Sequence, residues 1–282
     1  MKKLVVLGCA GMAGHIVAEY LSGQEEYQVF GIARSEGRFV THVVDVTDFT
    51  TLEATLTEIK PDHVINCVGV LVSKSSDDIC SAIQINSYLP HYLARLGKIH
   101  EFKLIHISTD CVFSGKVGGY KEDSFRDGDD NYARTKALGE VINNVDLTIR
   151  TSIIGPELKS NGTGLFDWFM KQSGKINGYT EAYWSGVTTY ELAKAIHEFI
   201  KQGVRGLYQL CPEDKISKYD LLKSFAEIWE HEVEISPVST YSVDKSLIST
   251  RKDFNYSVPD YQSMLQEQHD WMKVHAEYYT HY

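Results

Sequence analysis

The chain has 282 residues, of which 43% are hydrophobic and 23% charged, the composition of a globular protein with room for one large α/β unit and a smaller lobe. Its net charge of -10 argues against the phosphate backbone of a nucleic acid as a partner. No run of about 18 apolar residues is present to span a membrane. Five scattered cysteines without a Cys-x-x-Cys pair predict reduced thiols and a cytoplasmic location, and no metal-ligand spacing is found among the histidines.

A glycine-rich turn follows the first predicted strand. Residues 3–8 form a short apolar run of the kind buried on both faces of a parallel sheet, and the apolar run over residues 16–21 predicts a helix. Three glycines lead from strand to helix in a Gly-x-x-Gly-x-x-Gly pattern, which permits a tight turn and close approach of a pyrophosphate. The free N–H groups at the helix start favour these phosphates. The predicted contacts with a dinucleotide are Gly8, Gly11, Met12 and Gly14.

The next two strands are predicted to carry cofactor contacts at their ends. Residues 28–33 form the second strand, and Arg34 follows it. An arginine here suits the 2′-phosphate of NADP, whereas an acidic residue would suit the ribose of NAD. A surface arginine without a ligand is the alternative interpretation of Arg34. Residues 41–46 form a third short strand that ends in Asp45 and Val46, and Asp45 is placed to reach an adenine amino group.

Two further strands are predicted to end at the same edge of the sheet. The strand that begins at residue 63 ends in Cys67, Val68 and Gly69, small residues that let a cofactor lie across the strand end. The strand over residues 102–108 delivers Thr109 at its carboxyl end. Ligands bind at this end in open parallel sheets, so Thr109 is a candidate site residue.

A tyrosine and a lysine four residues apart follow a loop rich in Gly and Asp. Tyr132 and Lys136 face the same side of a predicted helix. The ammonium of Lys136 is expected to lower the pKa of the Tyr132 phenol from about 10, so that the phenol exchanges a proton near neutral pH. The hydroxyl of Thr109 is expected to help hold a carbonyl oxygen. Such a Tyr/Lys pair alone is weak evidence, and the glycine-rich turn is what makes it a candidate catalytic pair.

Strands and helices alternate up to a sixth strand over residues 146–151, which predicts an α/β fold with a Rossmann-type doubly wound parallel sheet. Residues 1–155 are expected to form an NAD(P)-binding domain. Residues 156–282 are expected to form mostly a smaller substrate-binding lobe, with some segments returning to the sheet. Residues 183–188 are predicted to be an aromatic loop. The predicted helices lie over residues 49–58, 77–96 with an interruption near Pro90, 165–171, 191–201, 218–229 and 263–276.

The combination of these motifs resembles the extended short-chain dehydrogenase/reductases. The resemblance rests on the glycine pattern, on Ser108-Thr109-Asp110 and on Tyr132-x-x-x-Lys136. The stretch over residues 107–115 is similar to the Ser-Thr-Asp-Tyr-Val-Phe-x-Gly segment of the dTDP-4-dehydrorhamnose reductase family. Arg150-Thr151-Ser152 and Ser249-Thr250-Arg251 resemble later segments of that family. The similarity covers nearly the whole chain and is strongest in the first 155 residues.

The resemblance implies NADPH-dependent reduction, with NADH as an option, of the C4 ketone of a nucleotide-linked 4-keto-6-deoxyhexose in deoxysugar or polysaccharide biosynthesis. It implies that Tyr132 donates the proton, that Thr109 hydrogen-bonds the same oxygen and that Lys136 orients the nicotinamide ribose. The expected partner is a nucleotide sugar, and a homodimer is an option. The implied substrate contacts are Thr109, Asp110, Cys111, Trp184, Lys245 and Arg251. A solvated lysine is the alternative interpretation of Lys245.

The residue after Asp110 departs from the family pattern, which has an aromatic there. Dehydratases of the same superfamily carry a glutamate base near this point, so Cys111 argues against 4,6-dehydration. GDP-fucose synthases carry a cysteine in this slot and epimerise beside the ketone before reducing it, which makes Cys111 a candidate base for epimerisation at C3 or C5. Their partner histidine is missing, because this chain reads Gly155-Pro156-Glu157. Packing of a small apolar residue near the sugar is the alternative.

Three other functions stay open from the sequence. A UDP-linked 2-acetamido-2,6-dideoxy-4-hexulose is an alternative substrate, since the family's active-site aromatic is gone. The regulatory subunit of methionine adenosyltransferase resembles the same family and binds NADP without reducing a sugar, so a non-catalytic NADP-binding subunit is a second alternative. An interaction scaffold, the third alternative, predicts no cofactor affinity.

Overall fold

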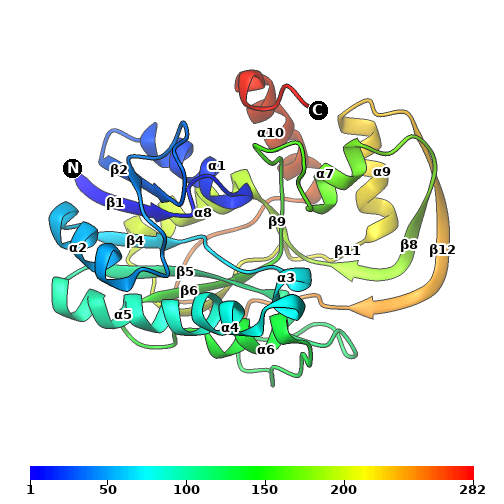
Figure 1. The fold of residues 1–282 in the computed structure, drawn as a ribbon. Coiled ribbons are helices and arrows are strands. Elements are labelled where there is room, and N and C mark those ends of the chain that lie inside the picture. Colours follow the sequence, from blue (N-terminus) through cyan, green and yellow to red (C-terminus); the bar gives the residue numbers. More distant parts are fainter.

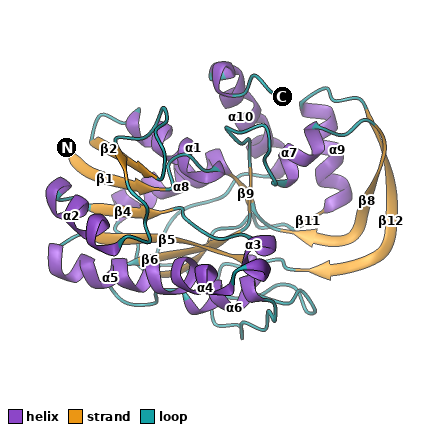
Figure 2. Ribbon diagram, viewed as in Figure 1, coloured by secondary structure: helices purple, strands orange, loops and turns teal.

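A seven-stranded parallel sheet forms the centre of the computed structural model, which describes residues 1–282 (Figures 1 and 2). The strand order is β10-β6-β5-β4-β1-β2-β3, and every neighbouring pair is parallel. The order reverses direction beside β1, as in doubly wound folds. The strands are β1 (Lys2–Leu7), β2 (Tyr27–Ala33), β3 (His42–Val43), β4 (His63–Asn66), β5 (Lys103–Thr109), β6 (Leu147–Thr151) and β10 (Gly206–Gln209). The predicted Rossmann-type α/β fold is confirmed.

Helices cover both faces of this sheet, because successive strand residues point to opposite faces and both sets are apolar. Leu4 and Val6 of β1 pack with helices α1 (Met12–Ser22) and α8 (Thr189–Gln202). Val5 and Leu7 pack on the other face with α2 (Phe49–Ile59) and α5 (Leu89–His100). All four β1 side chains are fully buried. The near-continuous apolar run of β1 is therefore explained by burial on two sides.

The helical region before β5 differs from the prediction of one helix over residues 77–96. It consists of α3 (Val72–Asp77), α4 (Ile79–Ala82), a π-helical segment (Ile83–Tyr88) and then α5. The break lies at Asp78, whose carboxylate caps α4 by accepting the Ser81 N–H at 3.0 Å. Pro90 causes no break, because it lies in the first turn of α5, where no intrahelical N–H bond is required.

The smaller lobe is built on two long strands that the sequence did not predict. β8 (Gly174–Trp184) pairs in parallel with β12 (Val233–Asp244) and antiparallel with the short β11 (Ile216–Ser217). Helices α7 (Leu165–Met170), α9 (Lys218–Ile228) and α10 (Tyr261–Val274) pack around a separate apolar cluster (Figure 1). The predicted aromatic loop over residues 183–188 is wrong. Its aromatic pair ends β8, and residues Val187–Thr188 form β9, which pairs with β7 (Ile153–Ile154).

The chain returns to the central sheet after residue 155. β10 pairs with β6 at one edge of the sheet, and α8 packs against α1. β1 is therefore covered on one face by α1 and α8, and α8 comes from the second half of the chain. None of the helices is long and apolar enough to cross a lipid bilayer.

Candidate active site

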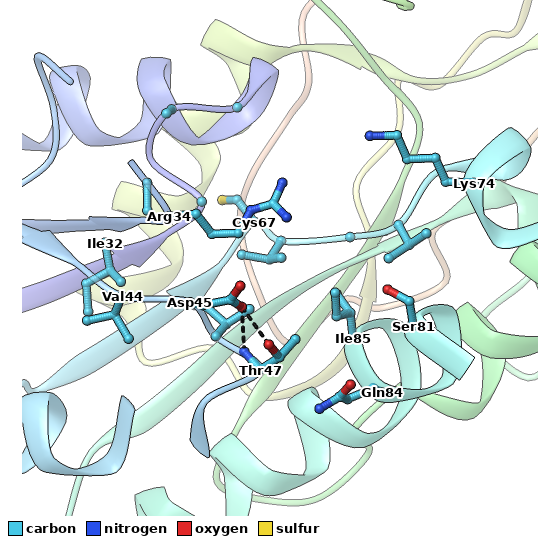
Figure 3. Close-up of a pocket in the computed structure, with 18 of the residues that line it drawn as sticks. Ile32, Arg34, Val44, Asp45, Thr47, Cys67, Lys74, Ser81, Gln84 and Ile85 are labelled. Carbon is cyan, nitrogen blue, oxygen red and sulfur yellow. Dashed lines mark hydrogen bonds between the residues drawn. The ribbon is translucent and has the colours of Figure 1, made fainter. Parts of the chain in front are cut away.

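A cleft of about 830 Å³ opens at the carboxyl ends of β1, β2 and β4 (Figure 3). These ends meet beside β1, where the strand order reverses, and this is where open α/β sheets bind ligands. Of the residues predicted to bind the cofactor, eight line the cleft: Gly8, Gly11, Arg34, Asp45, Val46, Cys67, Val68 and Gly69.

The glycine-rich turn forms one wall of the cleft. Gly8 has a φ of 78°, in the left-handed region that favours glycine. A Cβ on Gly14 would lie 2.1 Å from the Gly8 carbonyl oxygen, so Gly14 serves the close packing of α1 on the turn. Met12 begins α1 and, like Gly14, does not line the cleft.

Besides Asp45, the cleft is lined by polar residues that the sequence did not single out, among them Thr47, Lys74 and Lys159. Asp45 accepts hydrogen bonds from the backbone N–H of Thr47 at 2.9 Å and from its hydroxyl at 2.7 Å, and these bonds lower the pKa of the Asp45 carboxyl. Lys74 extends toward the cleft from α3 (Figure 3). Lys159 lines the cleft from the loop after β7. No local pattern identifies either lysine, because each comes from a segment distant in sequence from the glycine-rich turn.

The candidate catalytic residues come from β5 and from α6 (Asn131–Leu138). Thr109 ends β5, while Tyr132 and Lys136 lie one helical turn apart on α6. The Lys136 ammonium is buried and donates a hydrogen bond of 2.7 Å to the Ile107 carbonyl. Burial lowers the pKa of Lys136 to about 8, although the charges of Glu140 and Cys67 oppose this shift. Thr109, Tyr132 and Lys136 do not themselves line the cleft, whereas Cys67, which influences the pKa of Lys136, does.

The expected effect of Lys136 on Tyr132 is wrong for this structure. Burial raises the pKa of Tyr132 above its usual value, the nearby Cys111 and Asp110 raise it further, and hydrogen bonding with Thr109 opposes them. The Lys136 ammonium is instead engaged by the strand carbonyl of Ile107. The phenol of Tyr132 is therefore fully protonated at neutral pH, which is the form that can donate a proton.

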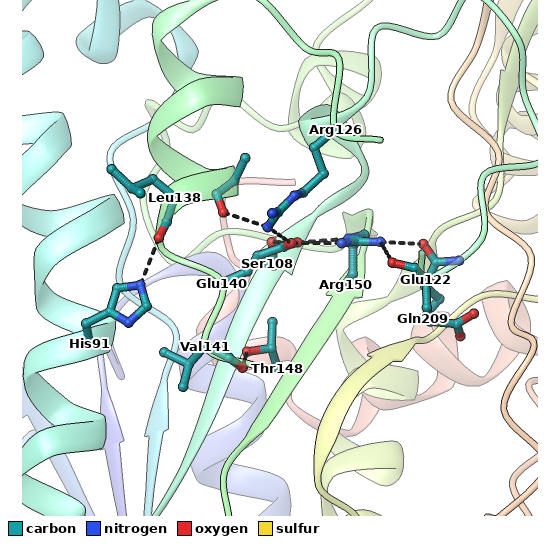
Figure 4. Close-up of polar contacts among 11 residues, drawn as sticks. His91, Ser108, Glu122, Arg126, Leu138, Glu140, Val141, Thr148, Arg150 and Gln209 are labelled. Carbon is teal, nitrogen blue, oxygen red and sulfur yellow. Dashed lines mark hydrogen bonds and ion pairs between the residues drawn. The ribbon is translucent and has the colours of Figure 1, made fainter. Parts of the chain in front are cut away.

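A buried ion-pair network connects α6 to the strands beneath it (Figure 4). Glu140 accepts two hydrogen bonds of 2.8 Å from Arg150 on β6, one of 2.8 Å from the Ser108 hydroxyl on β5, and one of 2.9 Å from Arg126. Burial alone would raise the pKa of Glu140, but these hydrogen bonds outweigh it and lower the pKa. Because Ser108 precedes Thr109, the network fixes the helix with Tyr132 against the strand with Thr109.

Two lysines approach the residues that follow Thr109. Burial raises the pKa of the Cys111 thiol to about 12, Asp110 raises it further, and the nearby Lys245 opposes both. Lys218, the first residue of α9, was not predicted; burial lowers its pKa to about 8, while Asp110 and Cys111 counteract the shift. Lys245, predicted to contact substrate, and Lys218 thus face the same short segment. No sequence motif could have identified Lys218 as a site residue, because its position near Asp110 depends on how the smaller lobe packs.

Comparison with protein families matches the RmlD substrate binding domain over residues 1–253. The chain belongs to this family. The dTDP-4-dehydrorhamnose reductase of Aggregatibacter actinomycetemcomitans is 30% identical over 142 residues, which are 50% of this chain and 46% of that protein. The dTDP-4-dehydrorhamnose reductase of Mycobacterium tuberculosis is 26% identical over 85% of this chain and 80% of its own length. Methionine adenosyltransferase 2 subunit beta of Xenopus tropicalis is 22% identical, covering 80% of this chain and 72% of that protein.

The solved structures agree on the fold. The dTDP-4-dehydrorhamnose reductase of Bacillus anthracis, solved in complex with NADP, has a TM-score of 0.80 at 21% identity, covering 95% of this chain and 98% of that one. The two proteins therefore share the same arrangement of helices and strands although their sequence identity is low. In the present chain, no three His, Cys, Asp or Glu side chains gather to hold a metal ion.

The predicted substrate contact through Arg251 is not supported by the structure. Trp184 is 3% exposed at the end of β8, packs in the apolar cluster of the smaller lobe and has its ring centre 4.9 Å from the Lys218 ammonium, so its contact with a sugar stays a prediction. Arg251 pairs with Asp253 and donates to the carbonyls of Arg205 and Leu207 at 2.6 and 3.2 Å. These carbonyls lie at the amino end of β10, whereas Thr109 lies at the carboxyl end of β5. Arg251 therefore supports the edge strand.

Proposed function

We propose that this RmlD-family protein reduces the C4 ketone of a nucleotide-linked 4-keto-6-deoxyhexose with NADPH. The observation that carries the proposal is that Tyr132 and Lys136 of α6 contact Thr109 and Ile107 of β5, the strand that pairs with β4, and that Cys67 to Gly69, directly after β4, line the cleft. The names of the relatives support a nucleotide sugar as the substrate class.

The cleft fits NADPH by its own residues. Gly8 and Gly11 leave the turn open to a pyrophosphate at the start of α1. Arg34 lines the cleft beyond β2 and forms no ion pair within the chain, so its guanidinium is free for a 2′-phosphate. NADPH is therefore proposed as the cofactor, with NADH as the weaker option.

Each catalytic side chain has a role that its environment supports. NADPH would supply the hydride when bound. Tyr132 donates its proton to the ketone oxygen as that oxygen gains negative charge, and its raised pKa keeps the proton available at neutral pH. Thr109 accepts the Cys111 backbone N–H at 3.1 Å, which fixes its hydroxyl near Tyr132 and the same ketone oxygen. Lys136, held by the Ile107 carbonyl on β5, would hold the nicotinamide ribose through its ammonium.

The structure argues against two of the three alternative functions and does not discriminate the third. Epimerisation through Cys111 requires a thiolate, and a thiol pKa of about 12 opposes it. A UDP-linked acetamido sugar stays an alternative substrate, and nothing in the geometry favours it over the dTDP sugar. A non-catalytic NADP-binding subunit is the other alternative, and the assembled Thr109, Tyr132 and Lys136 favour an enzyme over it.

The test is NADPH oxidation with a panel of dTDP- and UDP-linked 4-keto-6-deoxy sugars. Tyr132→Phe should lower kcat about 10²- to 10⁴-fold, the usual contribution of a general acid, because only the proton donor is lost. The Kd for NADPH should stay within about two-fold, because a phenylalanine keeps the ring and its packing.

Tyr241→Phe provides the matched control, since Tyr241 is exposed on β12 away from the cleft, and it should retain wild-type kcat. Near-normal turnover by Tyr132→Phe would refute the catalytic assignment. NADPH binding without turnover of any sugar in the panel would favour the regulatory subunit.

A further inference from the structure

The last residues of the chain fold back onto the segments that frame the cofactor cleft. Residues 275–282, here called the C-terminal strap, follow α10 and lie beyond the residues matched by the RmlD family. They contain five aromatic or imidazole rings, of which Tyr278 and Tyr279 pack on rings of the larger lobe and Tyr282 packs on Phe166 of α7 (Figure 1). The strap contacts three separate segments, each of which continues into residues that line the cleft.

The first contact is with the glycine-rich turn. The His15 ring lies 2.9 Å from the Gly11 carbonyl through Nδ1 and 2.7 Å from the Tyr279 hydroxyl through Nε2. A carbonyl oxygen can only accept, so Nδ1 carries the proton. Burial lowers the pKa of His15 to about 4, which leaves Nε2 bare at neutral pH, and the Tyr279 hydroxyl must donate to it. Tyr279 thereby fixes the tautomer and orientation of the ring that holds Gly11.

The second contact is with the loop after β2. The Arg38 guanidinium lies 4.1 Å from the centre of the Tyr278 ring and 3.4 Å from the Glu277 carboxylate. Phe39 packs edge-on against Tyr278, with 5.5 Å between ring centres. This loop continues from Arg34, which lines the cleft and is proposed to hold the 2′-phosphate.

The third contact is with the loop after β7. The Tyr282 hydroxyl oxygen accepts the Glu157 backbone N–H at 2.9 Å. The Glu157 carboxylate in turn accepts the backbone N–H groups of Thr163 and Gly164, each at 2.8 Å. The loop closed by these bonds contains Lys159, which lines the cleft. Glu157 also occupies the position where the epimerising reductases carry a histidine, so here this position supports the loop.

We propose that the C-terminal strap holds these three segments in the geometry that binds the cofactor, with Tyr279 and Tyr282 as positioning residues. Neither tyrosine lines the cleft, so each acts through another residue: Tyr279 through His15, and Tyr282 through Glu157. The proposal rests on NADPH being the ligand of the cleft, as in the proposed function.

The test compares Tyr279→Phe, Tyr282→Phe and a chain ending at residue 274, which lacks the strap, with the wild type. The measurement is the Kd for NADPH, taken from the fluorescence of the bound dinucleotide. Each substitution removes one hydroxyl and keeps the ring, so it should raise Kd by about two- to ten-fold, the equivalent of one net hydrogen bond. The truncated chain should raise Kd further. The kcat at saturating NADPH should be unchanged in both single variants, because no catalytic atom is touched.

Hydrogen exchange supplies a readout that does not depend on the cofactor. In the absence of NADPH, amides of the glycine-rich turn should exchange faster in Tyr279→Phe, and amides over residues 157–164 should exchange faster in Tyr282→Phe. Tyr241→Phe is the control and should change neither loop, since Tyr241 contacts only Tyr179 among the aromatic residues.

The outcomes separate the two proposals. Wild-type NADPH affinity and wild-type exchange in both single variants would overturn the strap while leaving the proposed function intact. Absence of NADPH and NADH binding by the wild type would overturn the proposed function, and the cofactor role of the strap with it. A rise in Kd without any change in kcat is the result that supports the strap.

Discussion

Lys136 is a cation held almost out of water, with 4% of its residue surface exposed and one short hydrogen bond to a strand carbonyl. Burial lowers its pKa from 10.5 to about 8. The unfolded chain therefore binds the proton more tightly than the folded protein, so the folded state gains stability as the pH rises from about 8 to 10.5. Below pH 8 the full cost of the buried charge is present, which indicates that the lysine is kept for function.

Replacing this charge should stabilise the protein while impairing its activity. Lys136→Met should raise the free energy of unfolding at pH 7 by about 1–3 kcal/mol, because the charge penalty exceeds one lost hydrogen bond. Urea denaturation at pH 7 and pH 9.5 measures this, and the gain should shrink at the higher pH. Lys175→Met, at an exposed ion pair with Glu234, is the control and should change stability by less than about 1 kcal/mol. A loss of stability in Lys136→Met would contradict the account.

Cys111 is the residue at which sequence and structure disagree about chemistry. The sequence makes it a candidate epimerisation base, but a pKa of about 12 leaves almost no thiolate at neutral pH. We expect the wild-type protein to incorporate no deuterium at C3 or C5 of a 4-keto sugar in D₂O at pH 7.5. Cys111→Ser should reduce the ketone at a rate within about ten-fold of wild type. Deuterium incorporation at C3 or C5 by the wild type, together with its loss in Cys111→Ser, would instead support Cys111 as an epimerisation base.

At the scale of elements, the glycine-rich turn and its flanking strand and helix were predictable because the whole signal is local. β1, the turn and α1 follow one another in 22 residues, and each glycine has a steric reason. β8 and β12 were missed for the opposite reason. β8 buries Ile176, Ala182 and Trp184 but is otherwise polar, and β12 contains Pro237, which is tolerated because β12 is an edge strand. Their pairing spans about 60 residues of sequence, and no local pattern encodes it.

The junction of α6 with β5 and β6 depends on the buried network around Glu140. Glu140→Gln removes the charge that pairs with Arg150 and leaves that arginine buried without a counter-ion. We expect it to lower the free energy of unfolding by about 3–5 kcal/mol, measured by urea denaturation at pH 7. Glu234→Gln removes one partner of an exposed pair and should cost at most about 1 kcal/mol. Equal losses in the two variants would show that the network does not support α6 as proposed.

At the scale of the whole molecule, buried neutral histidines should make the protein sensitive to acid. Burial lowers the pKa values of His15 and His63 from 6.5 to about 4, and it also lowers the pKa of His106 well below its usual value. Between pH 6.5 and 4 the unfolded chain binds more protons than the folded protein, so stability falls as the pH falls. Each histidine contributes up to about 1.4 kcal/mol per pH unit in this window.

Urea denaturation at pH 7, 6 and 5 should therefore show a loss of about 4–6 kcal/mol for the wild type. His63→Leu removes one titrating group whose Nδ1 has no hydrogen-bond partner, and its stability should depend less steeply on pH. A wild-type free energy of unfolding that is constant from pH 7 to pH 5 would contradict the buried, neutral state of these rings.

The packing of the smaller lobe against the sheet determines which site residues could not be predicted from the sequence. Residues of the first half, such as Gly8, Arg34 and Thr109, follow directly on strands, and a parallel sheet brings all strand ends to one edge. Lys218 approaches Asp110, and the C-terminal strap contacts the segments beside the cleft, only because the smaller lobe packs against that edge. Arg251 was misplaced for the same reason: a family-like segment shows which residues are present, but not at which end of β10 they lie.

A protonated phenol on α6 is proposed to complete the hydride transfer to a sugar ketone. The most direct measurement of this transfer uses NADPH deuterated at the transferring position of the nicotinamide, a nucleotide-linked 4-keto-6-deoxyhexose, and NMR of the product. We expect one deuterium at C4, none at C3 or C5, and labelling that is about 10²- to 10⁴-fold slower with Tyr132→Phe. Tight NADPH binding without deuterium in any sugar of the panel, or equal labelling by the variant, would contradict the proposal.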